Sequence, residues 1–188
     1  MQRRIAIVDY NPDWPNQFEQ YKSRIQSALA DKALKVDHIG STSVPGLAAK
    51  DVIDIQITVA DIEDEAIVHG LTEVGFVFRA ETNRDCLTGF EPDSIELKKC
   101  YFREPQGERE VHVHVRELGR VNQAYPLLFR DYLRVNHRAA QTYESLKKLL
   151  ASRFEFERSA YNTIKDPCMD LIYQAAKLWA RQVNWQPE

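Results

Sequence analysis

Residues 36–59 read VDHIGSTSVPGLAAKDVIDIQITV, and this stretch decides the fold. Two apolar runs, at 36–39 and 52–59, are typical of short buried strands. A turn of mostly small residues at 40–46 separates them and is expected to lead into a short helix over 47–50. The stretch therefore predicts two strands joined through a small-residue turn.

The turn has the composition of a phosphate-binding loop. Gly40 follows a strand and permits close backbone approach to an anion. The hydroxyl and amide groups of Ser41, Thr42 and Ser43 are then expected to face a phosphate at the positive end of the short helix, with Lys50 at the far end of that helix. A loop that only caps a helix has the same composition, and this alternative stays open.

The second apolar run carries two polar side chains, Asp54 and Gln56. Because side chains alternate along a strand, both point to the same face of the sheet. A carboxylate in an apolar strand is unfavourable to bury unless it is paired or binds a cation. Beside a phosphate loop, Asp54 is therefore predicted to hold Mg²⁺, which prefers hard oxygen ligands together with substrate phosphates.

The rest of the chain adds further strands and helices. Helices are expected over 14–33, 62–73, 125–136, 138–156 and 167–183, and strands over 76–79, 96–103 and 109–117. Residues 5–8 suit a short strand or an apolar arm, and the polar stretch 82–94 suits a mobile loop. The order predicts an α/β (α+β) fold in which helices flank a mixed sheet. We expect one domain over 1–188, with the sheet in about 1–118 and a helical tail in about 121–185.

The composition argues against several classes of protein. The 25 basic and 28 acidic residues leave a formal charge of −3, which argues against a protein held to nucleic acid by phosphate neutralisation. The three cysteines are widely spaced and show no CxxC pattern, so neither a disulfide framework nor a zinc knuckle is expected. The apolar runs are too short for a signal sequence or a membrane span. We therefore expect a cytoplasmic protein without a membrane partner.

Residues 38–50 and 53–55 closely resemble the signature of the GrpB family, which is assigned to the nucleotidyltransferase fold. The resemblance continues at 11–15, 112–115, 128–134, and at Tyr161 with Lys165. It implies a nucleotidyltransferase-like mixed sheet flanked by helices, with a C-terminal helical segment. It also implies that Gly40 and Ser41 form the nucleotide-phosphate loop and that Asp54 is the first metal-binding carboxylate.

The sequence departs from the acidic pattern of nucleotidyltransferases, which hold two Mg²⁺ with an acidic pair at alternate strand positions and a third carboxylate on a neighbouring strand. Gln56 stands at the second acidic position and offers one neutral carbonyl oxygen. His112 and His114 stand where the third acid is expected, and imidazole suits Mn²⁺, Zn²⁺ or Fe²⁺ better than Mg²⁺. One softer metal held by Asp54 and a histidine, with Gln56 beside it, is therefore an alternative to the usual pair. Ordinary hydrogen bonding is the other interpretation of the two histidines, and His38 is expected to pack in the core.

Basic and aromatic residues complete the predicted phosphate site. Lys98 is expected to point into the cleft from a strand on which basic residues alternate, while at least one of those residues faces solvent. Tyr161 and Lys165 are four residues apart and share one face of a helix. For Arg130 two interpretations stay open: contact with the substrate, or an ion pair that ties the helical tail to the sheet.

These features predict a metal-dependent nucleotidyltransferase that moves a nucleoside monophosphate from a nucleoside triphosphate to an unidentified small molecule or protein. Asp54 holds Mg²⁺ or Mn²⁺, with Zn²⁺ as a further option, and His112 or His114 completes the metal shell or acts as the base. The main alternative is a nucleotide-binding or protein-interaction module without turnover, since Gln56 removes a charge that catalysis would use. A single-metal phosphohydrolase is the third hypothesis.

Overall fold

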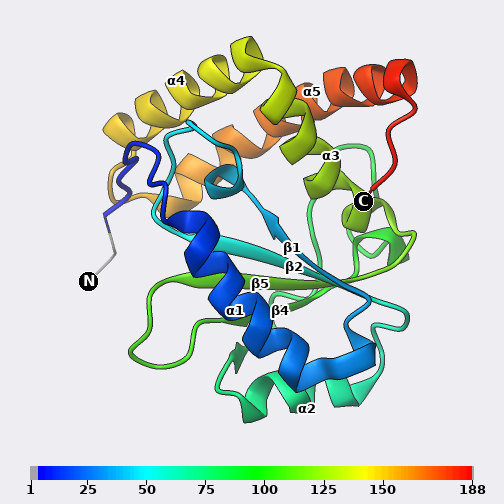
Figure 1. The fold of residues 1–188 in the computed structure, drawn as a ribbon. Coiled ribbons are helices and arrows are strands. Elements are labelled where there is room, and N and C mark those ends of the chain that lie inside the picture. Colours follow the sequence, from blue (N-terminus) through cyan, green and yellow to red (C-terminus); the bar gives the residue numbers. More distant parts are fainter. Residues whose placement is uncertain (1–3, 188) are drawn as a thin grey trace.

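One mixed sheet organises residues 4–187, the part of the chain that the computed structural model describes (Figure 1). Its strands are β1 (Lys35–Ile39), β2 (Ile53–Val59), β3 (Val77–Phe78), β4 (Cys100–Arg103) and β5 (Val111–Glu117). They lie in the order β1-β2-β5-β4-β3. Strands β2 and β5 are parallel neighbours at the centre, whereas the other neighbouring pairs are antiparallel. This arrangement confirms the predicted mixed sheet.

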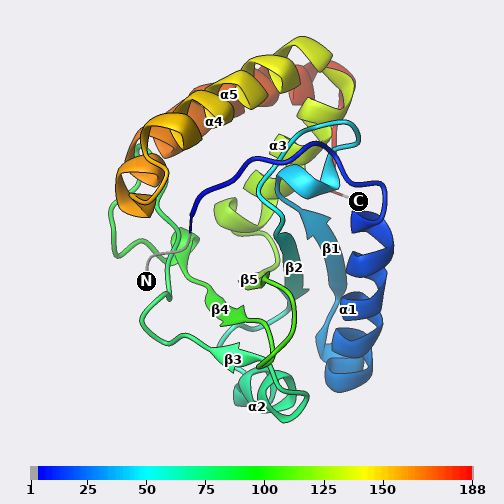
Figure 2. The ribbon, with the colours of Figure 1, turned by 90° about the vertical axis from the view of Figure 1, so that its left-hand side faces the viewer.

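Helices cover both faces of this sheet. They are α1 (Trp14–Leu29), α2 (Glu65–Glu73), α3 (Val121–Val135), α4 (His137–Arg153) and α5 (Arg158–Val183). Helices α1 and α2 lie on one side, whereas α3, α4 and α5 gather on the other (Figures 1 and 2). The C-terminal helical segment is therefore present as predicted. Among the described residues, no helix combines the length and the apolar content needed to cross a membrane.

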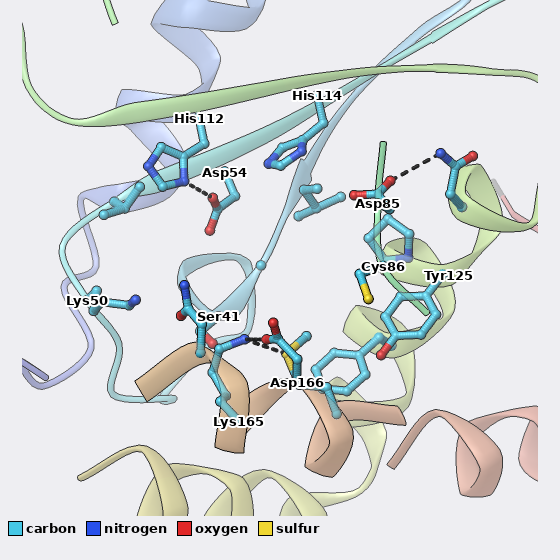
Figure 3. A pocket seen from close by; sticks show the side chains of 18 of the residues that line it. Ser41, Lys50, Asp54, Asp85, Cys86, His112, His114, Tyr125, Lys165 and Asp166 are labelled. Carbon is cyan, nitrogen blue, oxygen red and sulfur yellow. Dashed lines mark hydrogen bonds and ion pairs between the residues drawn. The ribbon is translucent and has the colours of Figure 1, made fainter. Parts of the chain in front are cut away.

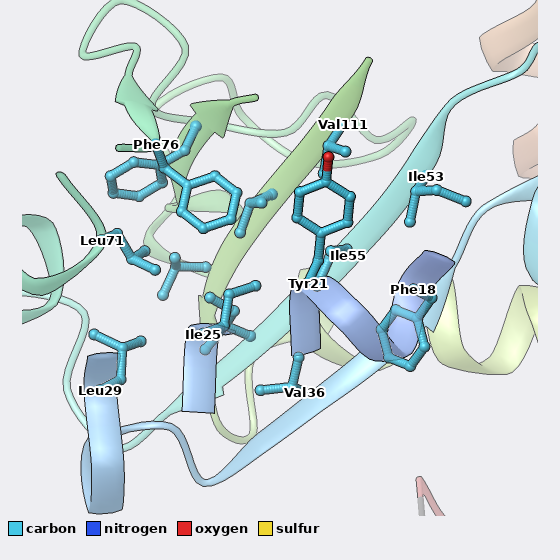
Figure 4. Packing of buried hydrophobic residues seen from close by; sticks show 14 of the residues in the cluster. Phe18, Tyr21, Ile25, Leu29, Val36, Ile53, Ile55, Leu71, Phe76 and Val111 are labelled. Atoms are coloured by element: carbon cyan, nitrogen blue, oxygen red, sulfur yellow. The ribbon is translucent and has the colours of Figure 1, made fainter. Parts of the chain in front are cut away.

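The two faces of the central strands differ because side chains alternate along each strand. One face is polar and carries Asp54 from β2 together with His112 and His114 from β5 (Figure 3). The opposite face is apolar and packs against α1 and α2 (Figure 4). Its strand residues are fully buried: Ile53, Ile55, Ile57, Val111, Val113 and Val115. The alternation therefore presents polar groups to α3–α5 while it buries a core under α1 and α2.

Helix α1 is held by apolar residues at helical spacing. Trp14, Phe18, Tyr21, Ile25 and Leu29 recur every three or four residues, and all five are buried in the core. Removing a large side chain from such a core typically destabilises a protein by about 2–5 kcal/mol, so this stripe fixes the helix on the sheet.

The turn after β1 differs from the prediction. The short helix expected over 47–50 is absent, and a single 3₁₀ turn occurs earlier, at Ser41–Ser43. The physical reason is that Pro45 and Gly46 directly precede the expected helix, and Gly46 has a positive φ of 79°. The serine and threonine groups therefore do not meet the positive end of a following helix, contrary to our expectation.

Several element boundaries also differ from the prediction. Helix α2 begins at Glu65, where the carboxylate of Asp64 accepts a hydrogen bond from the Ala66 amide. Strand β4 begins only at Cys100, because a 3₁₀ turn occupies Ile95–Leu97. Helix α5 begins at Arg158 and continues through Pro167, whereas the sequence predicts that it starts at Pro167.

The N-terminal residues form an arm and not a regular strand. A single antiparallel bridge joins Val8 to Ala49, and the Ile5 amide donates to the Glu155 carbonyl at 2.7 Å. Of the two options that the sequence left open for residues 5–8, the apolar arm is therefore the observed one.

Candidate functional site

A cavity of about 460 Å³ opens between the polar face of the sheet and helices α3–α5. Ligand pockets usually measure about 300–1,000 Å³, so a nucleotide-sized molecule fits this space. Residues expected at the site that line this cavity are Gly40, Ser41, Thr42, Lys50, Asp54, His112, His114, Tyr161 and Lys165. The fold thus gathers side chains from β2, β5, α5 and the turn after β1 around one space (Figure 3).

Asp54 and His112 form the centre of this site. They are register partners on the parallel strands β2 and β5, and Asp54 Oδ1 lies 3.1 Å from His112 Nδ1. The other ring nitrogen of His112 lies 3.4 Å from Glu110 Oε1. His112 therefore stands between two carboxylates, of which Asp54 faces the cavity.

The two carboxylates set the protonation of the His112 ring. Burial lowers the pKa of His112, but the hydrogen bonds to Asp54 and Glu110 outweigh burial and raise the pKa above its usual value. The same hydrogen bond, to His112, is the main reason that the pKa of Glu110 falls to about 2. Glu110 also pairs with Arg103 at 3.1 Å and with Arg158 at 3.4 Å. Our sequence reasoning missed Glu110, although its place two residues before His112 on the chain could have suggested it.

His114 lies next to this pair but in a different environment. Ligand atoms of Asp54, His112 and His114 all lie within 4.8 Å of one another, which is close enough for one metal ion. Burial, followed by the charges of Arg116 and Lys99, lowers the pKa of His114 well below its usual value. His114 is therefore a neutral imidazole near pH 7.

Gln56 is tied into a buried network and does not face the cavity as a free ligand. Its Nε2 donates to the Gln123 carbonyl at 2.9 Å, and its Oε1 accepts from Arg116 Nη1 at 2.7 Å. Arg116 in turn forms two hydrogen bonds with Asp85, which also pairs with Lys99 at 2.7 Å. The predicted use of the Gln56 oxygen as a metal ligand is not supported by this arrangement, because that oxygen accepts a hydrogen bond from the guanidinium.

The polar groups of the turn after β1 divide into two kinds. The hydroxyl of Ser43 donates to the Gly40 carbonyl at 2.6 Å, and Ser43 is absent from the cavity wall. The hydroxyl of Thr42 donates to the Val52 carbonyl at 3.0 Å and contacts His38. Both hydroxyls thus hold the turn together. Ser41, beside the buried Tyr143 hydroxyl, is left to face the cavity.

Lysines from the segment before β2 and from helices α4 and α5 line part of the cavity. Lys50 lies 4.5 Å from the ring centre of Tyr161, and burial, followed by the charges of Arg158 and Lys165, lowers its pKa to about 8. Lys147 is buried and donates to the Ala48 carbonyl at 2.6 Å; burial lowers its pKa to about 7. Burying cations side by side is unfavourable, so a bound anion would relieve their repulsion.

Basic side chains outnumber acidic ones around the cavity. The basic ones are Lys50, Arg84, Lys99, Arg116, Lys147, Arg158 and Lys165, and the acidic ones are Asp54, Asp85, Asp166 and Asp170. Since the whole chain has a formal charge of −3, this positive excess is local. Such a cleft attracts anions.

Two basic residues expected at the site lie elsewhere. Lys98 pairs with Glu63 outside the cavity, and its neighbour Lys99 points inward instead. The register decides this: Phe102 is buried in the apolar core and Tyr101 pairs with His114, so odd-numbered residues of this segment face the cavity side. Arg130 is bound by Asp131 and by the His38 carbonyl at 3.1 Å and does not line the cavity. Arg130 therefore ties α3 to β1, and its predicted contact with the substrate is not supported.

His38 packs in the core as expected. Its ring stacks on Phe18 with 4.8 Å between ring centres, and its Nε2 lies 3.0 Å from the Thr42 hydroxyl. It belongs to the apolar side of β1, away from Asp54.

The sheet order and the loop next to a strand aspartate define a class of proteins with the nucleotidyltransferase-like fold. The Cid1 poly(U) polymerase, solved with MgGTP bound, superimposes with a TM-score of 0.51 over 78% of this chain and 45% of that chain, at 12% identity. At this identity the likeness shows the fold alone.

The chain belongs to the GrpB protein family, because the sequence model of that family matches residues 4–175. The crystal structure of the conserved protein GrpB from Enterococcus faecalis superimposes with a TM-score of 0.77 at 33% identity, covering 93% of this chain and 99% of that chain.

Two curated relatives are longer than this chain. A UPF0157 protein of Halalkalibacterium halodurans is 38% identical over 148 residues, which cover 78% of this chain and 69% of the relative. The dephospho-CoA kinase of Mycobacterium tuberculosis is 35% identical over 99% of this chain, but the match covers only 50% of the kinase. The chain thus spans about half the length of that kinase.

Proposed function

We propose that this protein binds a nucleoside triphosphate together with a divalent metal ion and transfers the nucleoside monophosphate to a small molecule or protein. The observation that carries the proposal is the Asp54–His112 pair, which faces a basic cavity beside the Gly40–Ser41 turn. A carboxylate and an imidazole for the metal, with lysines for phosphates, are the parts that phosphoryl and nucleotidyl transfer require.

The residues present fit one divalent ion. Asp54 supplies an oxygen ligand and His112 supplies Nδ1, which already lie side by side. Behind them, Glu110 can accept the proton of His112 Nε2, as carboxylates commonly do for the free ring nitrogen of a metal-bound histidine. A mixed oxygen and nitrogen set favours Mn²⁺ or Zn²⁺ over Mg²⁺. When bound, such an ion would neutralise charge on the reacting phosphate and orient it.

Lys50, in the segment before β2, and Lys165 of α5 would hold the phosphate tail. Lys50 and Lys165 both line the cavity, and Ser41 faces the same space (Figure 3). Lys165 is held by Asp166 at 2.5 Å, so its ammonium group has a defined position. Their positive charges would stabilise a pyrophosphate leaving group.

A second function is favoured by one observation. Both ends of the Gln56 amide are occupied, so β2 supplies only one carboxylate where two are usual for the fold. A nucleotide-binding module without turnover fits this arrangement. It would bind the nucleotide but release no pyrophosphate.

Thermal melting with nucleotides tests the proposal. With each of the four ribonucleoside triphosphates and Mg²⁺, Mn²⁺ or Zn²⁺, at least one combination should raise the melting temperature by roughly 5–10 °C at a hundredfold excess over Kd. The Asp54→Asn variant should lose this shift. Asp93→Asn, which changes the same charge on an exposed loop residue, should keep it.

A pyrophosphate-release assay then separates the two functions. Release by the wild-type protein that stops in Asp54→Asn supports transfer, whereas a melting shift without release supports the binding module. If no nucleotide and metal combination shifts the melting temperature, both functions are wrong.

A further inference from the structure

We propose that the site holds a single divalent ion and that the guanidinium of Arg116 fills the place where nucleotidyltransferases bind a second one. The inference rests on the metal-dependent function proposed above. In this fold an acidic pair at alternate strand positions helps to hold two ions, and here Gln56 replaces the second acid of that pair. The Gln56 oxygen that would face the ion is hydrogen-bonded at 2.7 Å to Arg116 Nη1.

The guanidinium is fixed in this place from several sides. Arg116 belongs to β5 and points to the same face as His112 and His114. Its Nε and Nη2 donate to the two carboxylate oxygens of Asp85 at 2.9 and 3.1 Å, and its side chain is only 6% exposed. A planar guanidinium bound in this way cannot move without breaking several hydrogen bonds at once.

The orientation of Gln56 is fixed as well. Its amide nitrogen must face the Gln123 carbonyl, which accepts a hydrogen bond, and its oxygen must face Arg116, which only donates. Turning the amide would place two donors against each other and two acceptors against each other. The neutral oxygen of Gln56 therefore accepts a hydrogen bond from the guanidinium of Arg116 and is not free to bind a metal ion.

The charges around Arg116 also disfavour a second cation. Arg116 and Lys99 together carry two positive charges, and Asp85 balances one of them. The Nη2 of Arg116 lies 3.4 Å from His114 Nδ1, so that ring nitrogen faces a donor. A metal-bound imidazole normally donates a proton from its other nitrogen, which His114 cannot do toward a guanidinium. Asp54 and His112 are left as the ligand pair for one ion.

Electron paramagnetic resonance of bound Mn²⁺ tests this inference. Two Mn²⁺ about 3.5–4 Å apart give a spin-coupled spectrum, whereas one gives the spectrum of an isolated ion. We expect one uncoupled Mn²⁺ per wild-type chain, with Mn²⁺ alone and with a non-hydrolysable α,β-methylene analogue of ATP. The Gln56→Asp variant should also bind one, because Arg116 pairs with the new carboxylate.

The double variant Gln56→Asp/Arg116→Met should bind a second, coupled Mn²⁺, since Lys99 still neutralises Asp85 and the place of the guanidinium is vacated. A coupled pair in the wild-type protein would overturn the inference and leave the proposed function standing. A folded double variant with one uncoupled Mn²⁺ would also overturn it. Absence of any bound Mn²⁺ from the wild-type chain would overturn both. The wild-type spectrum decides the question even if the double variant does not fold.

Discussion

Gly40 adopts a backbone conformation with φ 72° and ψ −175°, which is almost exclusive to glycine. A Cβ at this position would lie 2.4 Å from Asp54 Oδ2. The glycine therefore serves two purposes: it allows the sharp turn after β1, and it leaves room for the carboxylate at the centre of the site.

Replacing Gly40 by alanine should lower the free energy of unfolding by about 3 kcal/mol, because backbone strain and the contact with Asp54 add. Gly46 is the matched control. Its φ of 79° is also positive, but a Cβ there meets nothing within 4 Å, so Gly46→Ala should cost only about 1 kcal/mol. Urea unfolding of both variants measures the difference, and equal losses would show that Asp54 does not require Gly40.

His38 links stability to pH. Burial lowers the pKa of His38 from 6.5 to about 4. Between these two pH values His38 is therefore protonated in the unfolded chain but neutral in the folded chain. The contribution of His38 to the free energy of unfolding is therefore fully present above pH 6.5 and is lost as the pH falls toward 4. Between pH 7.5 and pH 5 this amounts to about 2 kcal/mol.

The His38→Gln variant keeps a donor for Thr42 but does not titrate. Its unfolding free energy should fall by about 2 kcal/mol less than that of the wild-type protein over this pH range. Urea unfolding at pH 7.5 and pH 5 gives both numbers. Equal losses of unfolding free energy in the wild-type protein and the variant would contradict a lowered pKa of His38.

Secondary elements with a strong periodic pattern were predictable from the sequence, and so was the face that each strand presents. The alternation of side chains predicts that Asp54 lies on the face of the sheet away from the apolar core. The four-residue spacing predicts that Tyr161 and Lys165 lie on the same face of a helix. The network around Arg116 was not predictable, because it joins β2, β5 and the loop at 82–94 through contacts that leave no local pattern. The inward position of Lys99 depends on the register of β4 against β5, which the alternation of basic residues alone does not reveal.

The loop at 82–94 shows what local composition cannot reveal. It is polar and was expected to be mobile, yet Asp85 binds Arg116, Lys99 and Asn122. The Thr88 amide also donates to Asp170 on α5 at 2.9 Å. The loop is thus anchored to both walls of the cavity.

Asp85→Asn should lower the free energy of unfolding by about 3 kcal/mol, because it leaves two buried cations without their carboxylate. Asp93→Asn, an exposed position in the same loop, should change it by less than about 0.5 kcal/mol. Thermal or urea unfolding of the two variants checks this prediction. A small effect at Asp85 would mean that the loop is not anchored by charge.

At the scale of the whole molecule, the cavity depends on both the sheet and the helical segment. Val44 and Leu47 after β1 pack with Tyr125 and Phe129 of α3 and with Tyr143 of α4. Asp54 comes from the sheet, whereas Lys147 and Lys165 come from α4 and α5. We therefore propose that the two parts form one folding unit, since neither carries the site alone.

One folding unit predicts one cooperative unfolding transition. Trp14 reports on the sheet side, where it is fully buried, and Trp185 reports on the helical side, where it donates to Asp131. A variant that retains only Trp14 should melt by fluorescence at the same temperature as by circular dichroism. The Trp14→Phe variant, with its fluorescence from the helical side, should show the same agreement. Two separate transitions would contradict a single unit.

The most direct test of the site is the position of a metal ion. Crystals soaked with Mn²⁺ and a nucleoside triphosphate analogue should show one anomalous-scattering peak inside the cavity. We predict this peak at about 2.0–2.3 Å from an Asp54 carboxylate oxygen and from His112 Nδ1, with the Asp54–His112 hydrogen bond replaced by the ion. A cavity without a peak, with Asp54 and His112 still 3.1 Å apart, would contradict the account.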